Sequence, residues 1–234
     1  MKLLVYIAGA LIIIGILALT AVYKSYRCWH PVAPKAKKRK QHIICVGDSI
    51  TFGAGVIPFQ RWKSYPSYLQ CFFGKPYQVM NFGMSGRTLL STGDMPYTKE
   101  KNYLKTMEID DACYILMLGT NDARYKWWNA QRFQIELIQM IEGYLSHGER
   151  VVVIKPPKAH PAEDSGEVSF EICDELVYEV GKIIEETANE LSVPVIDLYS
   201  FTEKHPEWFS DGVHLNAEGN KQVAKYIYQV IKTF

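Results

Sequence analysis

Cysteine is scarce in this chain, and its placement argues against metal and redox chemistry. No two cysteines stand in a Cys-x-x-Cys pair, and no histidine and carboxylate residues cluster with the spacing of metal ligands. We therefore expect no metal, no cofactor and no disulfide framework. All five thiols are expected to be free, which suits a reducing compartment or an anaerobic source. The five positions are Cys28, Cys45, Cys71, Cys113 and Cys173.

Acidic residues are absent from the first 40 positions, and this absence divides the chain in two. Residues 1–40 carry eight Lys or Arg side chains, whereas the remainder carries 18 basic and 25 acidic side chains, a net charge of −7. An acidic domain is a poor candidate for binding nucleic acid. The remainder is long enough for one globular domain with a sizeable core.

The basic N-terminal part contains a long hydrophobic run. Residues 3–23 are 21 positions without a charge, about 30 Å of helix and enough to span a bilayer core. A cleaved signal peptide is the alternative, but its apolar region is normally about 7–15 residues and ends at a small-residue site. We expect residues 1–23 to be an uncleaved single-pass anchor and residues 24–41 a basic juxtamembrane linker. The linker either contacts anionic headgroups or is a solvated spacer.

Short apolar runs alternate with helical patterns over residues 42–234, and this alternation predicts a parallel α/β sheet. We expect strands at residues 42–46, 78–82, 112–118, 151–154 and 193–198. We expect helices at residues 64–73, 133–145, 172–191 and 217–231, the last capped by Asn216. In such a fold helices cover both faces of the sheet, and ligands bind beyond the carboxyl ends of the strands.

Four short blocks follow the predicted strands and supply the chemical groups that acyl transfer requires. They are Gly-Asp-Ser at 47–49, Asn-Phe-Gly-Met-Ser-Gly at 81–86, Gly-Thr-Asn-Asp at 119–122 and Asp-Gly-Val-His at 211–214. Ser49 is the candidate nucleophile, His214 the base that takes its proton, and Asp211 the carboxylate that orients the histidine. The N–H groups of Ser49 and Gly86 and the amide of Asn121 are the candidate donors to an oxyanion. Each residue alone has an ordinary alternative, since a serine here often caps a helix and a glycine often makes a turn.

The order of these blocks resembles the SGNH, or GDSL-type, hydrolase superfamily over roughly residues 41–234. The serine precedes the histidine by 165 residues, and the chain lacks a Gly-x-Ser-x-Gly elbow. The resemblance implies a flavodoxin-like three-layer α/β/α sandwich around a five-stranded parallel sheet. It also assigns the glycine of block two to Gly86 and the asparagine of block three to Asn121. The chain departs from the pattern at Arg87, where many members are acidic, and at Leu215, where proline is common.

Within the superfamily, several segments are similar to bacterial carbohydrate and sialate O-acetylesterases. These segments are 81–90, 93–97, 118–122 and 211–219. The resemblance implies a serine esterase that removes O-acetyl groups from sialate or from plant or bacterial polysaccharide through an acyl-serine intermediate. One alternative is a lysophospholipase or thioesterase-type acyl hydrolase acting on lipid, which the anchor favours. Another is a non-catalytic carbohydrate-binding protein on the same fold, against which the retention of all four blocks argues.

Four further residues are candidates for lining the substrate site. Trp127, Trp128 and Trp208 lie near blocks three and four, and sugar rings stack on such aromatic faces. Arg87 adds a positive charge near the cleft and would favour an anionic substrate. The alternatives are ordinary packing for the tryptophans and a structural ion pair for Arg87.

The membrane orientation is left open by the sequence. Seven of the eight basic residues in the first 40 follow the apolar run, and the positive-inside rule would keep the globular domain in the cytoplasm. Single-anchor hydrolases of the kind that the chain resembles more often face outward. By that analogy we expect an extracytoplasmic catalytic domain.

Overall fold

Five parallel strands form a single sheet in the computed structural model, which describes residues 2–29, 31–146, 150–161 and 168–233. The strands are β1 (Gln41–Gly47), β2 (Tyr77–Gly83), β3 (Ala112–Met117), β4 (Arg150–Lys155) and β5 (Val195–Asp197). Their order across the sheet is β2-β1-β3-β4-β5, and every neighbouring pair is parallel. This is the order of the flavodoxin-like doubly wound fold.

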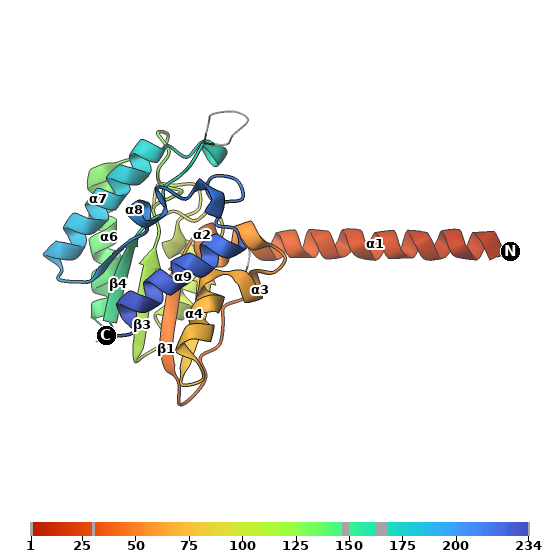
Figure 1. The fold of residues 1–234 in the computed structure, drawn as a ribbon, viewed down its shortest axis with the longest axis horizontal. Helices are drawn as coiled ribbons and strands as arrows, with labels where there is room; N and C mark the ends of the chain where they lie inside the picture. The colour runs from red at the N-terminus through yellow and green to blue at the C-terminus, as the bar shows by residue number, and fades with distance from the viewer. Residues whose placement is uncertain (1, 30, 147–149, 162–167, 234) are drawn as a thin grey trace.

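Helices cover both faces of the sheet, so the expected three-layer α/β/α sandwich is confirmed (Figure 1). On one face α6 (Ala130–Leu145) and α7 (Asp174–Glu190) pack against alternate residues of β1, β3 and β4. On the other face α4 (Tyr65–Phe73) and α9 (Ala217–Ile231) pack against the intervening residues. The two-residue period of a strand separates these two cores, and because both are apolar the strands read as continuous hydrophobic runs.

Short helices complete the chain. They are α2 (Ser49–Phe52), α3 (Gln60–Lys63), α5 (Lys101–Thr106) and α8 (Leu198–Thr202), with 3₁₀ turns at η1 (Ala54–Val56), η2 (Tyr97–Lys99), η3 (Ser169–Glu171) and η4 (Pro206–Trp208). The sequence pattern did not predict them, because helices of four to six residues are too short to show an amphipathic period.

The boundaries of the longer elements follow local capping. The helix expected at 217–231 has those bounds, and the Asn216 side chain accepts a hydrogen bond from Gly219 N at 3.0 Å. The helix expected from residue 133 begins at Ala130, because the Asn129 side chain caps it. The strand expected at 193–198 is shorter, since Asp197 accepts a hydrogen bond from Ser200 N and starts α8.

The N-terminal helix α1 (Lys2–Trp29) projects away from the sandwich (Figure 1). Its segment Tyr6–Tyr23 is long and apolar enough to cross a membrane, and none of that segment is buried inside the protein. A core helix of a soluble protein would be covered, so the exposure leaves a membrane span or a signal sequence as the explanation of this helix.

The residues after α1 pack against the domain and do not form a free spacer. Asn102 Nδ2 donates to the carbonyl oxygen of Pro31 at 3.2 Å. Gln78, on the edge strand β2, donates to Lys35 O at 2.9 Å and accepts from Lys37 N at 2.7 Å. The path of residues 31–37 is therefore fixed along the edge of the sheet by side chains of β2 and α5.

We expect Gly83→Ala to destabilise the fold. Gly83 ends β2 where the strand meets α2, and a Cβ there would overlap the backbone nitrogen of Phe52. Relief of that overlap requires backbone movement, so the free energy of unfolding in urea should fall by about 1–3 kcal/mol or more. Gly143→Ala in α6 is the control, because its Cβ would meet only Met107 Cε at 3.9 Å. That variant should gain about 0.4–1 kcal/mol; equal losses in both variants would contradict the steric argument.

Candidate active site

Ser49 lies at the carboxyl edge of the sheet, as the first residue of α2. Strand β1 ends at Gly47, and the side chain of Asp48 caps α2 by accepting from Ile50 N at 2.9 Å. The cap turns the chain sharply from strand to helix, which places the Ser49 hydroxyl in a pocket with 7% of the residue exposed.

His214 and Asp211 lie on a closed loop before α9. The loop is held by an antiparallel bridge between Phe209 and Leu215 and by a hydrogen bond from Ser210 N to His214 O at 2.8 Å. Within the loop, Asp211 Oδ1 accepts from the backbone nitrogens of Val213 at 3.0 Å and of His214 at 2.7 Å. The carboxylate thus fixes the loop and the imidazole at once.

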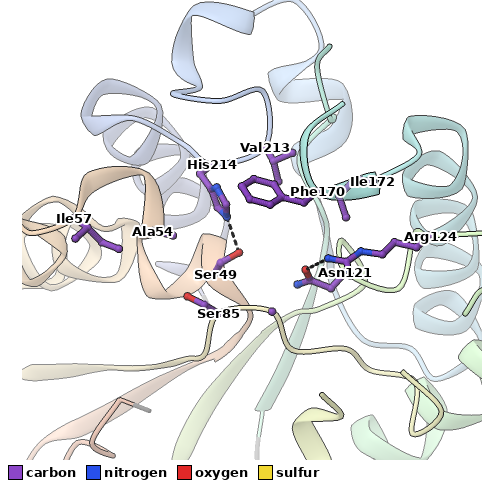
Figure 2. Close-up of a pocket in the computed structure, with 11 residues that line it drawn as sticks. Ser49, Ala54, Ile57, Ser85, Asn121, Arg124, Phe170, Ile172, Val213 and His214 are labelled. Atoms are coloured by element: carbon purple, nitrogen blue, oxygen red, sulfur yellow. Dashed lines mark hydrogen bonds between the residues drawn. The ribbon is translucent and has the colours of Figure 1, made fainter. Parts of the chain in front are cut away.

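Two hydrogen bonds run from Asp211 through His214 to the serine, and Figure 2 shows the second of them, between His214 and Ser49. His214 Nδ1 lies 2.7 Å from Asp211 Oδ2, and His214 Nε2 lies 2.9 Å from Ser49 Oγ. An ionised carboxylate only accepts, so Nδ1 carries the proton and Nε2 is free to accept from the serine hydroxyl. This is the tautomer in which the histidine can act as a base toward Ser49.

The environment keeps Asp211 ionised. Burial alone would raise the pKa of this carboxyl, but the hydrogen bonds and charge of His214, with the backbone N–H of Val213, outweigh burial. The net pKa is therefore lowered from its ordinary value. A carboxylate that stays charged near neutral pH stabilises the imidazolium that forms when His214 takes a proton.

The two other expected donors reach the same pocket. Gly86 has φ 78°, a left-handed conformation that glycine adopts without strain, and it lines the pocket beside Ser49. The Asn121 amide also lines it; its Nδ2 donates to Arg87 O at 3.1 Å and lies 3.3 Å from Asp48 Oδ2. These contacts hold the amide plane across the pocket from the serine (Figure 2).

Two buried carboxyls hold the loops that carry these donors. Burial raises the pKa of Asp48 to about 6, in spite of the hydrogen bond from Ile50 N. Burial raises the pKa of Asp122 to about 7, although it accepts from Leu89 N at 3.0 Å and from Leu90 N at 2.7 Å. Asp122 thereby ties the loop after β3 to the loop after β2.

The pocket in front of Ser49 has a volume of about 280 Å³ (Figure 2). Most of the lining beyond the expected residues is apolar, and it could not be predicted from the sequence because these side chains come from separate loops. Phe170 packs edge-on to the His214 ring with centroids 5.1 Å apart. The lining residues are Ser49, Ala54, Ile57, Ser85, Gly86, Asn121, Arg124, Phe170, Ile172, Val213 and His214.

None of the four residues predicted to line the substrate site belongs to this pocket. Arg87 is 3% exposed and forms an ion pair with Glu100 at 2.7 Å, which is the structural alternative considered for it. Trp128 donates from its indole to Glu179 at 3.0 Å, and the Trp208 ring stacks on His205 with centroids 3.8 Å apart. The Trp127 ring lies under Lys126 Nζ at 4.3 Å. Each of the four side chains therefore has a partner other than the residues that line this pocket.

Arg124 is the cationic residue that the sequence analysis missed. It lines the pocket, and its Nη2 donates to Asn121 Oδ1 at 3.4 Å. The carboxylate that pairs with it, Asp94, lies 3.7 Å from Arg124 Nη1, a long contact that compensates the charge only in part. Its position in the sequence could have indicated this role, because Arg124 comes three residues after Asn121 and follows the same strand, β3.

Within the described ranges, no three His, Cys, Asp or Glu side chains gather in a way that could hold a metal ion. Cys45 is buried in β1 and Cys71 is exposed on α4. Cys45, Cys71 and Cys173 are free thiols, and the side chain of Cys28 lies outside the described part of the structure. The side chains around Ser49 are instead a base, His214, its carboxylate partner, Asp211, and the amide of Asn121, which together suit nucleophilic acyl transfer.

Comparisons with known proteins agree with this geometry. An acetylxylan esterase from Xylanibacter ruminicola is 28% identical over 230 residues, which cover 87% of this chain and 46% of the relative. The chain therefore spans about half the length of that relative.

Two solved structures share the fold. A carbohydrate acetylesterase from Sinorhizobium meliloti has a TM-score of 0.66 and 19% identity, with 83% of this chain and 99% of the other covered. A lipase/acylhydrolase from Enterococcus faecalis has a TM-score of 0.62 and 26% identity, with 82% and 96% covered.

The family assignment comes from a match over most of the domain. Residues 45–222 fit the model of the GDSL-like lipase/acylhydrolase family, a range that includes Ser49, Gly86, Asn121, Asp211 and His214. The resemblance inferred from the four sequence blocks is thereby confirmed, and the chain belongs to the GDSL-like lipase/acylhydrolase family.

Proposed function

We propose that this protein is a serine esterase that removes O-acetyl groups from carbohydrates through an acetyl-Ser49 intermediate, without a cofactor. The observation that carries the proposal is the hydrogen-bonded chain from Asp211 through His214 to Ser49, at the mouth of a small pocket. Nucleophile, base and orienting carboxylate in this arrangement define acyl transfer on unrelated folds.

The first half of the reaction forms the acyl-enzyme. Ser49 Oγ attacks the ester carbonyl carbon while its proton passes to His214 Nε2, and Asp211 stabilises the resulting imidazolium. The carbonyl oxygen becomes negative and accepts hydrogen bonds from the N–H groups of Ser49 and Gly86 and from Asn121 Nδ2, which gives up its longer contact with Asp48 Oδ2 to do so. The tetrahedral intermediate then expels the sugar oxygen, which takes the proton from His214. The acetyl group remains on Ser49.

The second half releases acetate. A water molecule gives a proton to His214 Nε2 and attacks the acetyl carbonyl carbon, and the same donors hold the oxyanion. When the intermediate collapses, the bond to Ser49 Oγ breaks and the imidazolium returns its proton to that oxygen. The serine is regenerated, and no redox or metal chemistry is required.

The size of the pocket and the relatives favour a short acyl group on a sugar. The volume of about 280 Å³ is at the lower end of the roughly 300–1,000 Å³ of small-molecule sites, which suits an acetyl group better than a long chain. The relatives named above include an acetylxylan esterase and a carbohydrate acetylesterase. The second candidate is a lipid acyl hydrolase, favoured by the apolar side chains of Ile57, Phe170 and Val213 around the serine.

We also propose that α1 is retained as a single membrane anchor and that the domain faces away from the cytoplasm. The helix is continuous to Trp29 and its apolar segment is fully exposed, as a membrane span requires. A polymeric substrate does not cross a bilayer, which favours the outward orientation over the one that the basic flank suggests.

Ser49→Ala should lower kcat for acetate release by at least about a thousandfold, because His214 Nε2 is bonded to the hydroxyl of Ser49 and the variant removes that nucleophile. Acetate release from acetylated xylan, glucomannan and sialic acid, beside an ester series of rising chain length, measures both activity and chain preference. Ser200→Ala, on α8 with its hydroxyl bonded to Asp197, is the control and should keep full activity. Full activity of Ser49→Ala would refute the mechanism, and activity confined to long esters would favour the lipid candidate.

Arg124→Gln should lower kcat/KM more for an acetylated sugar that carries a carboxylate than for a neutral one. The partly compensated guanidinium in the pocket attracts a negative group on the substrate, and the amide removes that charge. The ratio of kcat/KM between acetylated sialic acid and acetylated xylose is the measurement. Equal losses on both would assign Arg124 to the support of Asn121 instead, through the bond between Nη2 and Oδ1.

The exposed thiol of Cys71 reports the orientation of the domain. In spheroplasts of cells that express the full chain, a membrane-impermeant maleimide should label this cysteine without permeabilisation if the domain faces outward. Cys71→Ser sets the background from the other thiols. Labelling that appears only after permeabilisation would place the domain in the cytoplasm, as the positive-inside rule suggests.

A further inference from the structure

A group of large apolar side chains is exposed on the segment 57–63, which includes α3. Ile57 is 41% exposed, Phe59 51% and Trp62 66%. Single exposed apolar residues are normal on a protein surface. Here three of them fall within seven consecutive residues, and two are aromatic.

The same segment is basic. Arg61 and Lys63 lie in the last turn of α3, and residues 57–63 contain no acidic side chain. Lys63 Nζ lies 5.2 Å above the centre of the Phe59 ring, so cation and aromatic ring share one surface. Aromatic side chains beside Lys and Arg are the composition of a surface that sits at a membrane–water interface. The charge of the segment contrasts with the net −7 of residues 41–234.

This surface lies beside the end of the N-terminal helix. The residues that follow α1, from Pro31 to Pro34, line a groove of about 510 Å³ together with Gln60 and Arg61 of α3. Val32, which adds to the apolar surface, is 66% exposed. Figure 1 shows α3 on the side of the domain from which α1 projects.

If α1 spans a membrane, distances along the chain place the segment 57–63 close to the outer limit of the headgroup layer. The apolar segment of α1 ends at Tyr23 and the helix ends at Trp29, so about 9 Å of helix separates the hydrocarbon from the domain. The headgroup layer is roughly 5–8 Å thick on each side of the bilayer. Because residues 31–37 are bonded to β2 and α5, they add little to the length of the tether between α1 and the domain.

We propose that the segment 57–63, with Val32, docks into the headgroup layer of the bilayer that α1 spans, and that it does so on an anionic lipid surface. The proposal rests on the anchoring proposed above and not on the esterase activity. Phe59 and Trp62 enter the layer, while Arg61 and Lys63 contact lipid phosphates. Ile57 belongs both to this segment and to the lining of the pocket at Ser49, so docking holds one wall of the pocket at the membrane surface.

Fluorescence quenching of the full chain in vesicles tests the contact. The chain carries serine in place of Cys28, Cys71 and Cys173, and a single cysteine introduced by Trp62→Cys bears an environment-sensitive fluorophore. The vesicles contain phosphatidylcholine and phosphatidylglycerol, with a nitroxide quencher on the lipid headgroup. Tyr178→Cys is the matched control: Tyr178 is 54% exposed on α7, which Figure 1 shows on the side opposite α1.

Docking predicts a blue shift and strong quenching of the label at position 62, with neither change at position 178. Adding Arg61→Glu and Lys63→Glu should reduce the quenching at position 62 in anionic vesicles. Equal quenching at the two positions in chains that float with the vesicles would overturn the docking and leave the anchor standing. Chains that fail to float would overturn both. Acetate release, measured on the same samples, reports separately on the esterase proposal.

Discussion

The hydrogen bond between His214 Nε2 and Ser49 Oγ is the interaction on which the whole site depends. It joins two residues 165 positions apart, one at the start of α2 and one in the loop before α9. Neither segment determines the distance alone. The backbone N–H of Tyr65 donates to Asn220 Oδ1 at 2.8 Å, and Asn220 Nδ2 donates to Leu215 O at 2.7 Å. These bonds tie α4, α9 and the histidine loop together on the same face of the sheet as Ser49.

The loops that carry Gly86 and Asn121 are held by two buried residues, Asp122 and Arg87, that do not line the pocket. Asp122 bonds the loop after β2 to the loop after β3, and Arg87 fixes the first of these through Ser85 O and Glu100. Their burial is costly for charged groups unless every polar atom has a partner. The carboxyl of Asp122 and the guanidinium of Arg87 meet that condition with backbone groups and one carboxylate. A preorganised oxyanion site is built in this way, from rigid loops and not from the donors alone.

Sequence patterns gave the fold and the reactive groups but not the lining of the pocket. Strand runs such as 112–118 are continuous and apolar because both faces are covered. Ser49 and Asn121 follow strand ends, which parallel topology brings to one edge, and His214 reaches the same pocket from the loop before α9. Trp128 and Trp208 are not among the residues that line this pocket, because an aromatic side chain in a loop can turn to the core or to the cleft, and nearby partners decide which. Phe170 and Arg124 escaped notice for the same reason, since their positions depend on how separate loops fold over the edge.

The strapped linker has a consequence for how the enzyme would meet its substrate. A free tether of the length of residues 31–40 would let the domain sweep a hemisphere above the membrane. The bonds from Gln78 and Asn102 hold residues 31–37 against the domain, so the tether that is left between α1 and the domain is much shorter. If α1 is the proposed membrane anchor, the active site then reaches only substrate that lies within a thin layer next to the bilayer. Its rate would then depend on the concentration of acetylated polysaccharide at the membrane surface and not on the concentration in bulk solution.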